Sequence, residues 1–148
     1  MKKFNGNPAH ILLVEDNQGD ARLAIEALKD GEISNILNHV FDGVEAMEYL
    51  KKEDKFNNAP RPDLILLDLN MPRMDGREFL AEIKNYPELA SIPIIVLTTS
   101  QNETDIAKSY HLNANCYISK PVDFKGFKNV MRAIEQFWFS VVSLPDTP

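Results

Sequence analysis

Short apolar runs alternate with longer amphipathic stretches along most of the chain. The apolar runs have the length and aliphatic character of β-strands and cover residues 10–14, 35–41, 63–67, 92–97 and 115–119. The stretches that follow them carry apolar residues at helical spacing, which predicts helices over residues 17–29, 42–50, 75–84, 102–110 and 124–142. This strand–helix alternation predicts a parallel sheet with helices on both faces.

Right-handed crossovers leave few arrangements of such units, and the pattern favours an α/β fold with a doubly wound, five-stranded parallel sheet. We expect the flavodoxin-like strand order 2-1-3-4-5, in which ligands bind beyond the carboxyl ends of strands one and three. The unbroken aliphatic run at 64–67 fits a central strand covered on both faces. Pro87 is expected to end the helix that begins near Asp75, and residues 51–62 to form a surface loop.

A length of 148 residues fits one domain with a single sizeable core. We predict a flexible arm over residues 1–9, the folded domain over 10–142 and a tail over 143–148. The sequence has no apolar leader and no apolar run long enough to cross a membrane, so a cytoplasmic protein is expected.

Charge and cysteine content narrow the possible partners. Sixteen basic and 22 acidic side chains give a net charge of −6, and no segment is rich in Lys or Arg. Neither nucleic acid nor a membrane is therefore expected as a partner. The single cysteine, Cys116, excludes an internal disulfide and a cysteine-rich metal site.

Charged side chains stand where three of the predicted strands end. Glu15 and Asp16 follow the first strand, Asp68 follows the third, and Lys120 follows the fifth. Carboxylates about 5 Å apart repel by on the order of 3 kcal/mol per pair, so these acids need protons, a lysine or a divalent cation. Oxygen ligands suit Mg²⁺, and Thr98 at the end of strand four offers a hydroxyl donor. The set suits phosphoryl transfer to Asp68.

Four motifs around these residues resemble the receiver domains of two-component response regulators, which are CheY-like proteins. They occur in the family's order and are Leu12-Leu13-Val14-Glu15-Asp16-Asn17, Leu66-Leu67-Asp68-Leu69-Asn70-Met71-Pro72 with Asp75-Gly76, Val96-Leu97-Thr98-Thr99-Ser100, and Tyr117-Ile118-Ser119-Lys120-Pro121. The resemblance covers residues 10 to about 140. It implies the same fold as the strand pattern.

The resemblance also implies the roles of individual residues. Asp68 would accept a phosphoryl group from a sensor histidine kinase, and Lys120 would hold that phosphate and the resting carboxylate. Asp16, Asp68 and the backbone carbonyl of Asn70 would bind Mg²⁺ or Mn²⁺, with Glu15 orienting the metal site. Thr98 and Tyr117 would form the switch that responds to phosphorylation. Such proteins catalyse only their own phosphorylation and dephosphorylation, and a cis Lys120–Pro121 bond is expected.

The last predicted helix carries more apolar surface than one core-facing stripe needs. Phe127, Val130, Ile134, Phe137 and Val141 have the spacing of the core face. The remaining apolar residues, Phe124, Met131, Trp138, Phe139 and Val142, are expected to form an interface, although the tail could instead fold back over them. The ending Phe137-Trp138-Phe139 through Pro145 resembles single-domain phytochrome-associated response regulators, which implies a phytochrome as kinase. It also implies a homodimer through the fourth and fifth strand–helix layer and this extension.

Two other functions stay open on the sequence. One is a receiver-fold interaction module that works without phosphorylation, for which Asp68 would be dispensable. The other is a Mg²⁺-dependent phosphatase that forms an aspartyl phosphate. The haloacid-dehalogenase type of that enzyme needs a second acid two residues after its nucleophile, where this chain has Asn70.

Overall fold

The chain folds around a parallel sheet of five strands in the order β2-β1-β3-β4-β5, as the strand pattern predicts. This computed structural model describes residues 7–69, 71, 73–98 and 114–138. The predicted helix at 102–110 therefore lies outside the described residues. The strands are β1 (Ala9–Val14), β2 (Asn35–Val40), β3 (Leu64–Asp68), β4 (Ile94–Thr98) and β5 (Cys116–Ser119).

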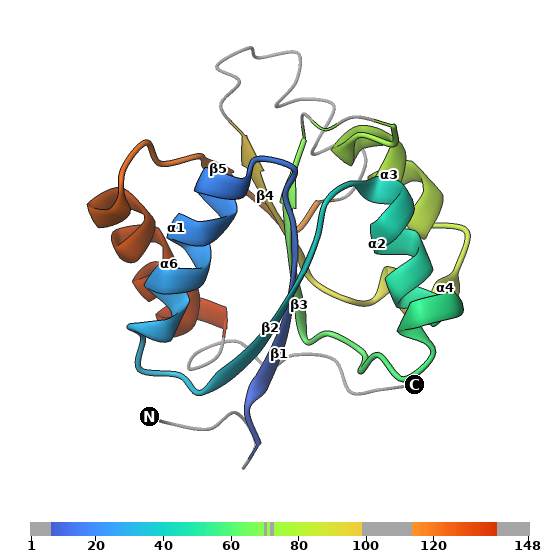
Figure 1. Cartoon of the computed structure of the whole chain (residues 1–148), viewed down its shortest axis with the longest axis horizontal. Helices are drawn as coiled ribbons and strands as arrows, with labels where there is room; N and C mark the ends of the chain where they lie inside the picture. Colours follow the sequence, from blue (N-terminus) through green and yellow to red (C-terminus); the bar gives the residue numbers. More distant parts are fainter. Residues whose placement is uncertain (1–6, 70, 72, 99–113, 139–148) are drawn as a thin grey trace.

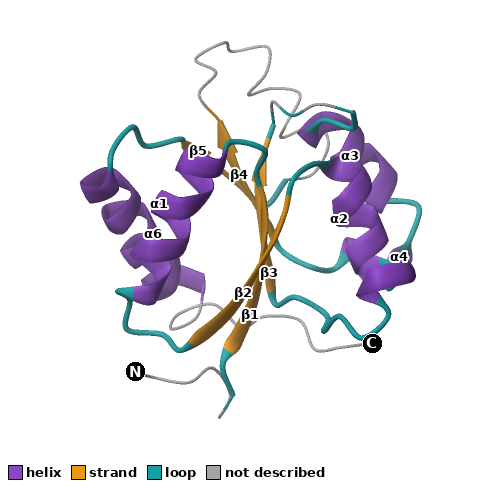
Figure 2. Cartoon of the chain, in the orientation of Figure 1, coloured by secondary structure: helices purple, strands orange, loops and turns teal. Residues whose placement is uncertain are grey.

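Helices cover both faces of this sheet (Figures 1 and 2). One face packs against α1 (Gln18–Lys29) and α6 (Phe124–Trp138). The opposite face of the sheet packs against α2 (Gly43–Leu50), α3 (Gly76–Ile83) and the short α4 (Pro87–Ala90). A 3₁₀ turn, η1 (Asp54–Phe56), lies within the predicted surface loop.

The interior is divided by the sheet into two cores rather than the one that was expected. Alternate residues of β1 point to opposite faces, so Leu12 packs with α2 and α3 while Ile11 and Leu13 pack with α1 and α6. Every residue of β3 is buried, which agrees with its unbroken aliphatic sequence. The central strand that ends at Asp68 is thus fixed from both sides.

Polar side chains begin three of the helices at the carboxyl edge of the sheet. Asn17 caps α1 by accepting from the Asp20 backbone N–H at 2.9 Å, and Asp42 caps α2 in the same way. Asp75 forms a capping box at the start of α3. Each cap directly follows a strand end or its loop, so these helices start beside the predicted site.

Two boundary predictions need correction. Pro87 does not end α3, which stops at Ile83; it occupies the first turn of α4, where its missing N–H leaves no hydrogen bond unmade. The arm predicted for residues 1–9 reaches too far, because Ala9 is fully buried and opens β1.

The buried face of α6 differs from the predicted one. Met131, expected at an interface, is fully buried between Phe127 and Ile134, and Trp138 packs partly against the same core. Phe137, expected in the core, is 53% exposed. The inward-facing residues are Phe127, Met131, Ile134 and Trp138. They follow helical spacing as well as the predicted set does, and packing against α1 selects them.

Candidate functional site

The acids predicted from the strand ends gather at one point. In the sheet register Val14 lies opposite Leu67, so the residues that follow β1 come next to Asp68. One carboxylate oxygen from each of Glu15, Asp16 and Asp68 lies within 4.8 Å of the others. Glu15 and Asp68 are buried, at 3% and 5% exposure, while Asp16 is exposed. The arrangement matches the sequence prediction for Glu15, Asp16 and Asp68.

Lys120 reaches this cluster from the end of β5. Its ammonium nitrogen lies 2.6 Å from Glu15 Oε1, 2.8 Å from Asp20 Oδ2 and 3.9 Å from Asp68 Oδ2. Burial would lower the pKa of Lys120, but the hydrogen bonds to Asp20 and Glu15 raise it above the ordinary value. The lysine is therefore a cation at neutral pH, and its shortest contacts are with Glu15 and Asp20 rather than Asp68.

Asp20 is a member of the site that the sequence reading missed. That reading took Asp20 only as a mark of the helix entry, because acids are common in the first turn of a helix. A signal existed, since Asp20 lies in the first turn of the helix that begins just after Glu15 and Asp16, at the same edge of the sheet. Spacing alone does not show that its side chain turns toward Lys120.

Glu15 is held by other protein groups, which separates its role from that of its neighbours. Oε1 pairs with Lys120, and Oε2 accepts a hydrogen bond from the backbone N–H of Asn17 at 3.2 Å. These two contacts leave Glu15 less available to a cation than an unengaged carboxylate would be. Two acids at this separation with a buried neighbour form a donor set of hard oxygen atoms, which fits Mg²⁺ or Mn²⁺.

The loop after Asp68 is tied down on both sides. A side chain at Gly76 would place its Cβ 2.6 Å from the backbone oxygen of Asp68, so only glycine allows α3 to start this close. Arg73 has a positive φ of 60° and donates to both carboxylate oxygens of Asp42, at 2.6 and 3.1 Å. The backbone N–H of Gly43 donates to Met74 O at 2.8 Å. This loop therefore joins the edge of the sheet that carries the acids to the start of α2.

The remaining predicted residues are placed only in part. Thr98 ends β4, and its side chain and Asn70 lie outside what the structure describes. Tyr117 lies on β5 opposite Val96 and packs half-buried against the core on the α2–α3 face. No described peptide bond is cis, so the expected cis Lys120–Pro121 bond is wrong; trans is the form that X–Pro bonds favour by about 0.5–1 kcal/mol.

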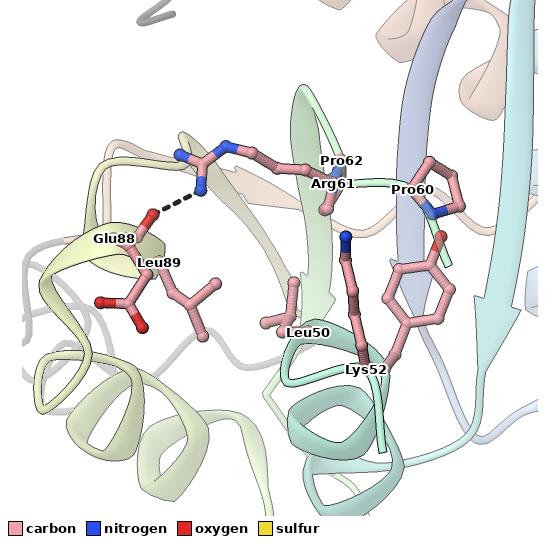
Figure 3. Close-up of a pocket in the computed structure, with 8 residues that line it drawn as sticks. Leu50, Lys52, Pro60, Arg61, Pro62, Glu88 and Leu89 are labelled. Carbon is pink, nitrogen blue, oxygen red and sulfur yellow. Dashed lines mark hydrogen bonds between the residues drawn. The ribbon is translucent and has the colours of Figure 1, made fainter. Parts of the chain in front are cut away.

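A separate pocket lies at the opposite end of the sheet (Figure 3). It has a volume of about 260 Å³ and is lined by Tyr49, Leu50, Lys52, Pro60, Arg61, Pro62, Glu88 and Leu89. Arg61 crosses it and donates to the Glu88 carbonyl and, at 2.9 Å, to the Ser91 hydroxyl. These residues precede β3 and β4, so the pocket is remote from the strand ends that carry the acids. Its one carboxylate gives it no comparable cluster.

Comparisons with known proteins show the family to which the chain is similar. Residues 11–132 match the family described as the response regulator receiver domain. The chain is 49% identical over 145 residues to the response regulator Rcp1 of Synechocystis sp., an alignment that covers 98% of this chain and 99% of that protein.

Two solved structures share the fold. The Mn²⁺-bound form of Rcp1 has a TM-score of 0.86 and 49% identity, covering 94% of this chain and 100% of that one. The phosphorylated cyanobacterial phytochrome response regulator RcpA has a TM-score of 0.88 and 50% identity, covering 94% and 99%. Among the described helices of the present chain, none has the length and apolar character needed to span a membrane.

Proposed function

The chain belongs to the response regulator receiver domain family, whose work is phosphorelay signalling, and we propose that Asp68 is its phospho-acceptor. The observation that carries this proposal is the position of Asp68 at the end of β3, buried beside Asp16 and within 3.9 Å of the Lys120 ammonium. A carboxylate beside a lysine ammonium can act as a nucleophile toward a phosphoryl group.

The donor in this proposal is a phosphohistidine of a sensor histidine kinase. A carboxylate oxygen of Asp68 attacks the phosphorus atom, an O–P bond forms, and the P–N bond breaks with its electron pair staying on the imidazole nitrogen. Asp16, Asp68 and the Asn70 backbone carbonyl would hold Mg²⁺ or Mn²⁺, with Glu15 orienting the site. The metal, when bound, would supply positive charge that offsets the negative charge of the phosphoryl oxygens.

The response to phosphorylation is assigned to β4 and β5. Thr98 ends β4 and lies opposite Ser119 in the register, while Tyr117 sits two residues before that point. A phosphoryl group on Asp68 offers an acceptor to the Thr98 hydroxyl, and a shift of Thr98 gives Tyr117 a different space to pack in. This is a switch by rearrangement between neighbouring strands. The only catalysis in the proposal is the protein's own phosphorylation and dephosphorylation.

The partners are proposed on the names of relatives and on the surface of α6. Since RcpA is described as a phytochrome response regulator, a phytochrome is the kinase class that we propose. A homodimer through the β4–β5 side and the C-terminal extension is supported by Phe124, which is 39% exposed. The proposed interface also includes Trp138, and Phe139 and Val142, which lie outside the described residues. Met131 is no part of it, because the protein's own core buries it. A cytoplasmic location is part of the proposal, because a histidine kinase takes its phosphoryl group from ATP.

Incubation with acetyl phosphate, followed by mass spectrometry, tests the acceptor. Wild type is expected to gain one labile phosphoryl group in Mg²⁺ and none in a chelator, and Asp68→Asn is expected to gain none. Asp54→Asn is the matched control, because Asp54 is an exposed acid in η1 with φ of 49°, a conformation that asparagine tolerates. Modification of Asp68→Asn would overturn the proposal, and an unmodified wild type would favour the phosphorylation-independent module.

A further inference from the structure

The ammonium group of Lys120 is shared by two carboxylates other than the phospho-acceptor. Glu15 and Asp20 lie at 2.6 and 2.8 Å, within charge-assisted hydrogen-bond range, whereas Asp68 at 3.9 Å lies beyond it. The Lys120 side chain is only 6% exposed. Its resting position is therefore set by Glu15 and Asp20.

These two carboxylates are not equally free to move. The Glu15 side chain is 4% exposed and is also held by the Asn17 N–H. The Asp20 side chain is 31% exposed, although its backbone is fixed by the Asn17 cap. Asp20 can thus rotate into solvent without disturbing α1, and Glu15 cannot move without leaving buried groups unpaired.

A phosphoryl group on Asp68 changes what Lys120 should bind. Phosphate brings close to two negative charges and three acceptor oxygens to the Asp68 position, 3.9 Å from an ammonium that already pairs with Glu15 and Asp20, so these anions compete for Lys120. We propose that Asp20 is a positioning residue that holds Lys120 back from Asp68 in the resting state and releases it on phosphorylation. This inference rests on the proposed role of Asp68.

The proposal gives opposite signs for the two ligands of the site. The negative charge of Asp20 attracts a divalent cation, so its removal weakens Mg²⁺ binding. The same charge repels a phosphoryl group and competes for Lys120, so its removal strengthens binding of a phosphoryl mimic. A purely structural role for Asp20 would weaken both, because a damaged site binds neither ligand well.

The experiment measures two affinities on the full chain. Mg²⁺ binding is followed by calorimetry, and beryllofluoride binding by ¹⁹F NMR at saturating Mg²⁺, in wild type, Asp20→Asn and Asp20→Ser. Both variants are expected to bind beryllofluoride about two- to fivefold more tightly than wild type, which is the range for loss of a partly exposed ion pair. Both are expected to bind Mg²⁺ a few-fold more weakly.

Two controls make the result specific. Glu26→Gln removes one charge from the exposed side of the same helix and should leave both affinities unchanged. Asp20→Glu restores the charge and should return Mg²⁺ affinity toward wild type. Unchanged affinities in Asp20→Asn and Asp20→Ser, or a loss of both, overturn the role of Asp20. A wild type that binds no beryllofluoride instead overturns the role of Asp68, and with it this inference.

Discussion

Shortening Met131 is expected to destabilise the protein far more than shortening Phe137, although both are large apolar residues of α6. Met131 is 0% exposed and lies in the core formed with α1, whereas Phe137 is 53% exposed. Met131→Ala therefore removes buried contacts and leaves a cavity. Phe137→Ala removes a side chain that is already largely in solvent.

The two variants should differ by several kcal/mol. Truncating a buried methionine to alanine lowers the free energy of unfolding by about 2–5 kcal/mol in a well-packed core. An exposed substitution outside such a feature stays within about 0.5 kcal/mol. At about 2–4 °C per kcal/mol for a chain of this size, the melting temperature should fall by roughly 5 °C or more for Met131→Ala and by less than about 2 °C for Phe137→Ala.

Urea unfolding followed by far-ultraviolet circular dichroism measures this difference. Trp138 fluorescence is unsuitable, because its ring lies 5.5 Å from the Phe137 ring and its signal would respond to the substitution itself. Equal losses in the two variants, or a larger loss in Phe137→Ala, would refute the assignment of Met131 to the core. Repeating the measurement over a range of protein concentration, with light scattering, shows whether Phe137 is covered in a dimer, since only then does its loss depend on concentration.

Two further predictions concern charge. Burial would raise the pKa of Asp42, but hydrogen bonds from Arg73 and from the Glu45 N–H hold that pKa below its usual range. The ionised carboxylate therefore stabilises the fold at pH values above the unfolded pKa of about 3.9. That stabilisation is lost as the pH falls through the lower pKa of the folded state. Asp42→Asn, which keeps the helix cap, should be less stable than wild type in urea at pH 7 and approach it below about pH 4. Mg²⁺ at about 100 times its dissociation constant should stabilise wild type by about 2.7 kcal/mol in thermal unfolding. Asp16→Asn should lose most of that gain and Asp54→Asn should keep it; an equal gain in both would count against Asp16 as a ligand.

The sheet and the meeting of the acids could be predicted because both follow from strand ends. In a parallel sheet the residues after each strand lie at one edge, so the meeting of Glu15, Asp16, Asp68 and Lys120 follows from the strand boundaries and the strand order. Small boundary errors, such as the start of β1 at Ala9, did not change which residues end a strand.

Side-chain direction on helices was harder to predict. The sequence of α6 has apolar residues on several faces, and periodicity cannot choose between the stripe with Met131 and the stripe with Phe137. That choice is made by packing against α1, which is a tertiary contact. The same limit hid Asp20, whose turn toward Lys120 depends on where β5 ends in space.

The charges at the site explain why the resting protein should need a cation before it accepts phosphate. Among the described residues, the carboxylates of Glu15, Asp16, Asp20 and Asp68 face the single ammonium of Lys120, so the site carries an excess of three negative charges. A divalent cation reduces that excess to one, and converting the Asp68 carboxylate to an acyl phosphate then adds at most one more. Without the cation, the same reaction would raise an excess that is already three. Asp20 contributes one charge to this balance, and its side chain beside Lys120 is 31% exposed. Its loss is therefore expected to shift the site from metal binding toward phosphate binding.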